Sequence, residues 1–136
     1  MSYKIERFPV TQEEITRVMD RFYARIRRHA VLGPVFAAHV GETDADWDRH
    51  IAKIDGFWAR ALLGTEGYDG NPMAAHVGNP LIKLDHFPIW LDLFEGTLAA
   101  ELPPEVAVAW GAMAHRIARG FRMAMGDRDA GMPVLR

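Results

Sequence analysis

The fold is decided at residues 70–80, which read GNPMAAHVGNP. Asn71 suits the N-cap of a helix, and Pro72 suits its first position because proline fixes φ and lacks an amide that would have no helical partner there. The turn residues Gly78-Asn79-Pro80 end this helix after about two turns. His76 is therefore predicted on a helix of roughly seven residues, held by turns on both sides. Such a short helix fits a simple four-helix bundle poorly and fits a cofactor pocket better.

A second histidine, His50, lies in a longer helical pattern that reads Trp47-x-x-His50-x-x-x-Ile54-x-x-Phe57-Trp58. This helix is predicted to begin near Thr43 or Asp44, with carboxylates at its positive end, and to stop at Gly64. Two histidines that face each other from two helices can bracket a metal cofactor. They can also be unrelated core or surface residues, and their local contexts leave both interpretations open.

Apolar stripes at helical spacing predict three more helices. A capping box at residues 11–14 starts the first, which ends before Gly33-Pro34. Another starts near Asp85, and the last opens at Pro103-Pro104-Glu105 with a stripe that runs to about residue 125. Because nothing in the sequence favours a strand, the helices predict an all-α fold.

Length and composition predict one soluble domain over residues 1–136, with residues 1–10 as an N-terminal extension and residues 126–136 as a flexible tail. No apolar run approaches the ~18–20 residues that cross a bilayer, so no membrane association is expected. The N-terminus lacks the apolar core of a signal peptide, and we expect a cytoplasmic protein.

The absence of cysteine and the weak net charge of −2 exclude several classes of function. Without cysteine, disulfides, thiolate metal sites, iron–sulfur clusters and covalent haem attachment through Cys-x-x-Cys-His are ruled out. The small net charge gives no basic surface for nucleic acid. Any metal must therefore be held by nitrogen or oxygen, and small-molecule chemistry in a monomer or weak dimer is the expectation.

Several groups of residues match one known family along nearly the whole chain. They are Phe22-Tyr23, Leu32-Gly33-Pro34-Val35-Phe36, Trp47-x-x-His50, Phe57-Trp58-x-x-x-Leu62-Leu63-Gly64, Tyr68-x-Gly70-x-Pro72-Met73-x-x-His76 and His86-Phe87-x-x-Trp90-Leu91. With these residues the chain resembles the truncated haemoglobins. The paired glycines of other truncated groups are absent, which favours the third group. The resemblance implies a globin-like two-over-two helical sandwich around a non-covalent haem b.

The resemblance also implies a role for each side of the haem. His76 resembles the proximal ligand, whose neutral imidazole binds haem iron. Tyr23 and Trp90 resemble distal residues that donate hydrogen bonds to a bound diatomic ligand. His50 occupies the distal-histidine position, where it would donate to the ligand, open and close the pocket, or ligate the iron as a conditional sixth ligand.

Other side chains are implied as haem contacts, although each taken alone is equally an ordinary core residue. These expected contacts are Phe36, Ile54, Phe57, Trp58, Met73, Phe87 and Ile117. Candidates for the haem propionates are His86, Lys83 and Tyr68. The remaining histidines, His29, His39 and His115, have no ligand spacing and are expected at the surface or in packing.

The resemblance makes a haem b protein that binds O2, NO or CO at His76-ligated iron the first functional expectation, with no residue assigned a certain catalytic role. One alternative is a haem enzyme that performs NO dioxygenation or peroxidase-like chemistry with an external reductase as partner. Another is a haem-free helical interaction domain in which His50 and His76 are structural.

Overall fold

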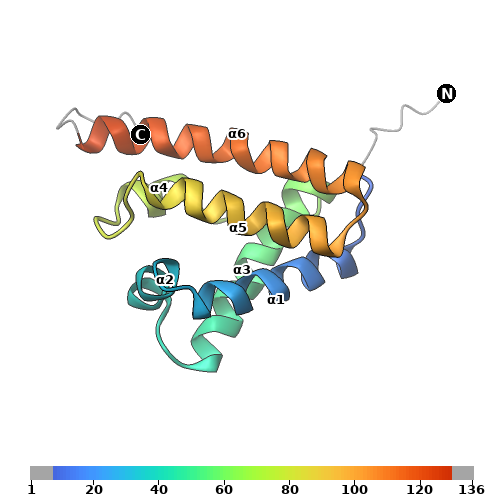
Figure 1. Ribbon diagram of the computed structural model, residues 1–136, viewed down its shortest axis with the longest axis horizontal. Helices are drawn as coiled ribbons and strands as arrows, with labels where there is room; N and C mark the ends of the chain where they lie inside the picture. The colour runs from blue at the N-terminus through green and yellow to red at the C-terminus, as the bar shows by residue number, and fades with distance from the viewer. Residues whose placement is uncertain (1–7, 130–136) are drawn as a thin grey trace.

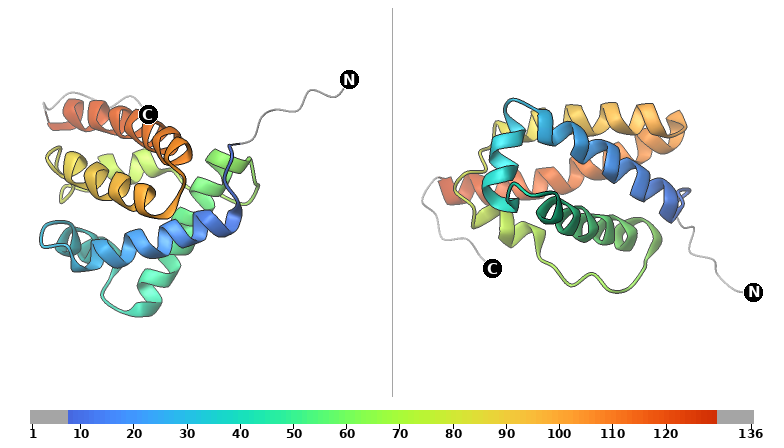
Figure 2. Two further views of the ribbon diagram at one scale, coloured as in Figure 1. Left: turned by 45° about the vertical axis from the view of Figure 1, so that its right-hand side comes forward. Right: turned by 90° about the horizontal axis from the view of Figure 1, so that it is seen from below.

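The computed structural model of the chain describes residues 8–129, and every regular element among them is a helix. The helices are α1 (Gln12–Arg28), α2 (Leu32–Val40), α3 (Asp44–Leu63), α4 (Pro72–Val77), α5 (His86–Glu101) and α6 (Pro104–Asp129). α5 and α6 run antiparallel side by side, and α1 packs against both α3 and α5 (Figure 1, Figure 2). The pair α1 and α3 thus packs against the pair α5 and α6, and the predicted two-over-two all-α fold is confirmed.

α1 begins at the predicted capping box. The Thr11 hydroxyl accepts a hydrogen bond from the Glu14 amide at 3.1 Å, and the Glu14 carboxylate accepts one from the Thr11 amide at 3.0 Å. This cap satisfies two amides that would otherwise have no helical partner. The predicted stripe is the buried face of the helix and comprises Ile15, Val18, Met19, Phe22, Tyr23 and Ile26.

α2 is a helix that the sequence pattern does not predict, since Gly33-Pro34 was interpreted as a stop. Pro34 is the third residue of α2, where proline is tolerated because first-turn amides have no helical acceptor. Gly33 lets α2 start close to the end of α1: a Cβ at this position would lie 3.0 Å from the Arg27 carbonyl oxygen. α2 therefore folds back beside α1 and brings the Phe36 ring within 6.1 Å of the Tyr23 ring.

α3 and α4, which carry the two histidines, begin and end as predicted. Thr43 caps α3 in a capping box, and Gly64 ends it with φ of 72°, in the left-handed region that glycine adopts without strain. The Asn71 side chain caps α4 by accepting from the Ala74 amide at 3.1 Å, with Pro72 at the first helical position.

The expected N-terminal extension and the expected tail each contain residues that the structure describes. α6 continues to Asp129, so residues 126–129 of the expected tail are helical. Val10, in the expected N-terminal extension, is buried, and Phe8 packs against the core. Residues 1–7 and 130–136 lie outside the described residues.

Candidate functional site

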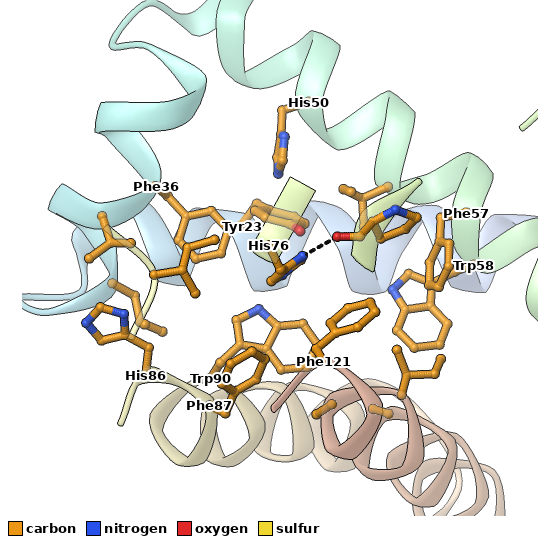
Figure 3. A pocket seen from close by; sticks show the side chains of 18 residues that line it. Tyr23, Phe36, His50, Phe57, Trp58, His76, His86, Phe87, Trp90 and Phe121 are labelled. Carbon is orange, nitrogen blue, oxygen red and sulfur yellow. Dashed lines mark hydrogen bonds between the residues drawn. The ribbon is translucent and has the colours of Figure 1, made fainter. Parts of the chain in front are cut away.

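A cavity of about 900 Å³, measured to its open mouth, lies where all six helices meet. The walls are mostly aliphatic and aromatic, and none of the described lining residues is acidic. The lining consists of Tyr23, Leu32, Val35, Phe36, His50, Ile54, Phe57, Trp58, Pro72, His76, Ile82, His86, Phe87, Trp90, Ala114, Ile117, Ala118 and Phe121 (Figure 3).

His76 projects from α4 into this cavity, and its ring is oriented from within that helix. Its Nδ1 atom lies 2.6 Å from the carbonyl oxygen of Pro72, about one turn earlier. Because a carbonyl only accepts, Nδ1 carries the proton of the neutral ring and Nε2 keeps its lone pair. Burial lowers the pKa of His76, although the hydrogen bond to Pro72 acts in the opposite direction. His76 is thus held in the neutral form that binds metals.

His50 projects from α3 toward His76 (Figure 3). Its Nε2 atom is buried and has no hydrogen-bond partner among the described residues. Burial, helped by neighbouring basic groups, lowers the pKa of His50 to about 4. A buried polar atom without a partner is unfavourable by ~1–3 kcal/mol. A ligand that bonded to Nε2 of His50 would remove this unfavourable contribution.

Tyr23 and Trp90 bring two neutral hydrogen-bond donors to the same space. Tyr23 is 3% exposed, and burial raises the pKa of its phenol above the ordinary value, so the hydroxyl keeps its proton. Figure 3 shows the Tyr23 oxygen and the Trp90 indole nitrogen on the sides of their rings that face the two histidines. The Trp90 ring is fixed by stacking on Phe94 at 4.9 Å and by an edge contact with Phe22 at 5.2 Å.

The structure brings together all but one of the residues that the sequence placed at the site. Those that line the cavity are Tyr23, Phe36, His50, Ile54, Phe57, Trp58, His76, Phe87, Trp90 and Ile117. Met73 is the exception. Its side chain is 42% exposed, and its Cε atom lies 3.6 Å from where a Cβ on Gly120 would stand. Met73 therefore covers part of α6 and does not line the cavity.

α6 contributes a wall that the sequence interpretation missed apart from Ile117. Ala114, Ala118 and Phe121 lie beside Ile117 in the lining, and the Phe121 ring packs 4.5 Å from the ring of His76. The spacing of three to four residues between them is the signal that could have identified this face, since it repeats once per helical turn.

A second cavity, of about 690 Å³, adjoins the first and shares His50, Ile54 and His76 with it, among others. The other lining residues of this second cavity are His39, Lys53, Tyr68, Asn71, Ala75 and Asn79. The three propionate candidates are therefore separated: Tyr68 lines the second cavity, His86 lines the first, and the exposed Lys83 lines neither.

Within residues 8–129, no cluster of three or more His, Cys, Asp or Glu side chains could hold a metal ion by itself. No helix in this part of the chain is both long and apolar enough to cross a membrane.

No protein-family model matches the chain, but a known sequence and a solved structure are similar to it. The chain is 42% identical over 89 residues to Group 3 truncated hemoglobin ctb from Campylobacter jejuni, an alignment that covers 65% of this chain and 70% of that protein. The crystal structure of a group III truncated hemoglobin from Campylobacter jejuni matches with a TM-score of 0.83 at 34% identity. That match covers 92% of this chain and 95% of the other, so sequence and backbone point to the same kind of protein.

Proposed function

Because the chain belongs to the group 3 truncated haemoglobins, we propose that it holds haem b without covalent attachment and binds a diatomic gas in the cavity between His50 and His76. Bound haem would supply an iron centre that takes O2, NO or CO. His76 would be the protein ligand to the iron. Tyr23, Trp90 and His50 would line the space that the gas occupies.

The observation that carries this proposal is the pair of imidazoles that point at each other across an apolar cavity. His76 keeps the Nε2 lone pair because Nδ1 carries the ring proton and donates it in a hydrogen bond to the Pro72 carbonyl oxygen. The Nε2 atom of His50 is buried without a partner among the described residues. A flat apolar ring with a metal at its centre matches aromatic and aliphatic walls that carry nitrogen donors on both sides. The residues present therefore fit a haem.

The role of His76 depends on its ring staying in one orientation. The hydrogen bond to Pro72 lies within α4, so this short helix itself orients the imidazole of His76. The Phe121 ring at 4.5 Å limits rotation of the imidazole. Capping by Asn71 and Gly78 in turn fixes both ends of α4. These contacts keep the lone pair of His76 directed into the cavity.

Tyr23 and Trp90 would stabilise a bound gas that carries partial negative charge. Both side chains donate from a cavity with few other polar groups, where such hydrogen bonds act strongly. A net contribution of ~1–1.5 kcal/mol per donor slows release about tenfold. Slow release suits sequestration or chemistry better than rapid delivery.

The same two donors favour a second candidate, in which the protein is an enzyme that performs NO dioxygenation or peroxidase-like chemistry. Hydrogen-bond donors that polarise an O–O bond would assist either reaction. The electrons would have to come from a separate reductase. Turnover of NO or peroxide in the presence of a reductase would distinguish this enzyme from a protein that only binds gas.

The test of the haem proposal is reconstitution of the purified chain with hemin. We expect a sharp Soret band that saturates at one hemin per chain and is lost or strongly changed in His76→Ala. The matched control is His115→Ala, because His115 is an exposed histidine that pairs with Glu95 away from the cavity. Absence of the band in the wild-type chain would leave the haem-free interaction domain as the better description.

A further inference from the structure

The outer face of α6 carries positive charge that the described part of the chain does not pair. Residues 106–126 of this helix include Arg116, Arg119 and Arg122 and no aspartate or glutamate, although the whole chain has a net charge of −2. All three arginines are exposed, and none of them forms a hydrogen bond or an ion pair with another described residue. Like charges three residues apart on a helix repel one another, so an anionic partner would stabilise this face.

Exposed methionines lie beside these arginines. Met123 is 69% exposed, and Met73, which reaches across from α4, is 42% exposed. The Cε atom of Met73 lies 3.6 Å from where a Cβ on Gly120 would stand. Arg116, Gly120 and Met123 follow one another in steps of four and three residues, so they share one side of α6. The face thus combines flexible apolar side chains with arginines, and both residue types are enriched where proteins bind one another.

The inner side of the same helix reaches the candidate cofactor site. Phe121 follows Gly120 in the sequence and lines the first cavity, where its ring packs 4.5 Å from the ring of His76 (Figure 3). α4, which carries His76, packs against α6, and α6 lies along the outside of the molecule (Figure 1). Only the thickness of one helix, about 10 Å, therefore separates the basic face from the residue proposed to ligate iron.

We infer that this arginine face of α6, formed by Arg116, Arg119, Arg122, Met123 and Met73, is the docking surface for an acidic flavoprotein that delivers single electrons to the cofactor. The inference rests on the proposed function, because O2 binds to ferrous and not to ferric haem iron. In the step, the reduced flavin of the partner loses one electron and ferric iron becomes ferrous. No bond forms or breaks in this chain.

An acidic protein suits the arginine face better than a membrane or a nucleic acid does. Guanidinium groups bind carboxylates through two parallel hydrogen bonds, and exposed methionines adapt to the irregular surface of a protein. Glu95 of α5 already pairs with His115 of α6, which leaves the three arginines available to a partner. Exposed charges of this kind mainly speed association, which suits a partner that binds briefly, transfers an electron and leaves.

The first test measures binding without electron transfer. The probe is oxidised flavodoxin, a small acidic protein that carries FMN, and its Kd for the hemin-loaded chain is determined at low and high ionic strength. At low ionic strength Arg116→Glu and Arg119→Glu should each raise Kd about fivefold, and at high ionic strength this effect should nearly vanish because salt screens exposed charges. Arg119→Lys should bind nearly as the wild type does. Met123→Ser should raise Kd at both ionic strengths, because it removes an apolar contact.

The second test measures the rate at which haem iron is reduced. Photoreduced flavodoxin is compared with photoreduced 5-deazariboflavin, a small uncharged molecule that needs no docking surface. Arg119→Glu should slow reduction by flavodoxin at low ionic strength and leave reduction by the small molecule unchanged. Arg28→Glu is the matched control in both tests. It makes the same change in charge at an exposed residue of α1 that forms no ion pair with the described residues.

Four results would overturn the inference. Wild-type chain that does not bind flavodoxin has no such docking surface. Equal weakening by Arg119→Glu and Arg28→Glu would mean that net charge alone governs binding. Slower reduction by both reductants in Arg119→Glu would mean that the substitution disturbs the cofactor site. Tighter binding to vesicles of anionic phospholipid than to flavodoxin, lost in Arg119→Glu, would assign the face to a membrane. All four leave the proposed function intact, whereas failure of the chain to bind hemin removes the proposed function itself.

Discussion

Acid should destabilise the haem-free protein through His50, in a pH window that its pKa defines. The pKa of His50 is about 4 in the folded chain and 6.5 for an ordinary histidine. Between these values the unfolded chain binds a proton that the folded chain does not, so the free energy of unfolding falls as the pH is lowered from 6.5 toward 4. Lowering the pH from 6.5 to 4 should reduce the free energy of unfolding by ~3 kcal/mol, because the two pKa values differ by about 2.5. About 2 kcal/mol of this loss should have occurred by about pH 5.

The physical cause is the environment of the ring. The imidazole packs edge-on against Tyr23 at 5.3 Å and against Phe36 at 6.1 Å, so water solvates a positive charge there poorly. Nε2 has no acceptor among the described residues that would stabilise a second ring proton. His50→Leu removes the titrating group and fills the same space with an apolar side chain of similar size.

Urea unfolding of the haem-free wild type and of His50→Leu at about pH 7 and about pH 5 measures this contribution, provided the two proteins unfold with equal slopes. On going from about pH 7 to about pH 5, the free energy of unfolding should fall by ~2 kcal/mol more in the wild type than in His50→Leu. If wild type and His50→Leu lose the same stability on acidification, the buried, charge-excluding environment assigned to His50 is wrong.

Three further substitutions test other parts of the structure. Tyr23→Phe should raise the O2 dissociation rate of the reconstituted protein severalfold, up to about tenfold, because one hydrogen-bond donor is lost; an unchanged rate in stopped-flow measurements would remove Tyr23 from the proposed role. Gly33→Ala should lower the free energy of unfolding by ~1–3 kcal/mol, since its Cβ would stand 3.0 Å from the Arg27 carbonyl oxygen; Gly56→Ala, where a Cβ meets nothing within 4 Å, is the control. Thr11→Ala should cost about 1 kcal/mol in urea unfolding through loss of the cap on α1, and no loss would mean that the capping box does not stabilise the helix.

Local chemistry made most of the helices predictable. The caps at Thr11, Thr43 and Asn71 and the stop at Gly64 are interactions between residues within one turn, so sequence spacing determines them directly. The apolar stripe of α1 likewise follows from helical periodicity. α2 was missed because Gly-Pro is a strong turn signal, and only the tight contact between Gly33 and the end of α1 shows that the glycine serves packing.

The site was less predictable wherever it depends on distant parts of the chain. His39 has no ligand spacing to any other histidine, yet α2 places it in the wall of the second cavity with Lys53 and His76. Met73 precedes His76 by about one turn and matched the family pattern, but its side chain lies over Gly120 of α6. Both differences arise from how α2 and α4 pack on other helices, which periodicity within a helix does not encode.

The two histidines that face each other are not equivalent, and the difference lies in what orients each ring. His76 is oriented by the carbonyl of Pro72 within its own short helix, so its lone pair points into the cavity. His50 is held by aromatic rings from three helices, those of Tyr23, Phe36 and Trp47, and by no hydrogen bond to Nε2 from the described residues. Ring contacts restrict position but set no preferred bond direction for that nitrogen. Removing His76 should therefore abolish tight binding of the cofactor, whereas removing His50 should change what happens to the gas.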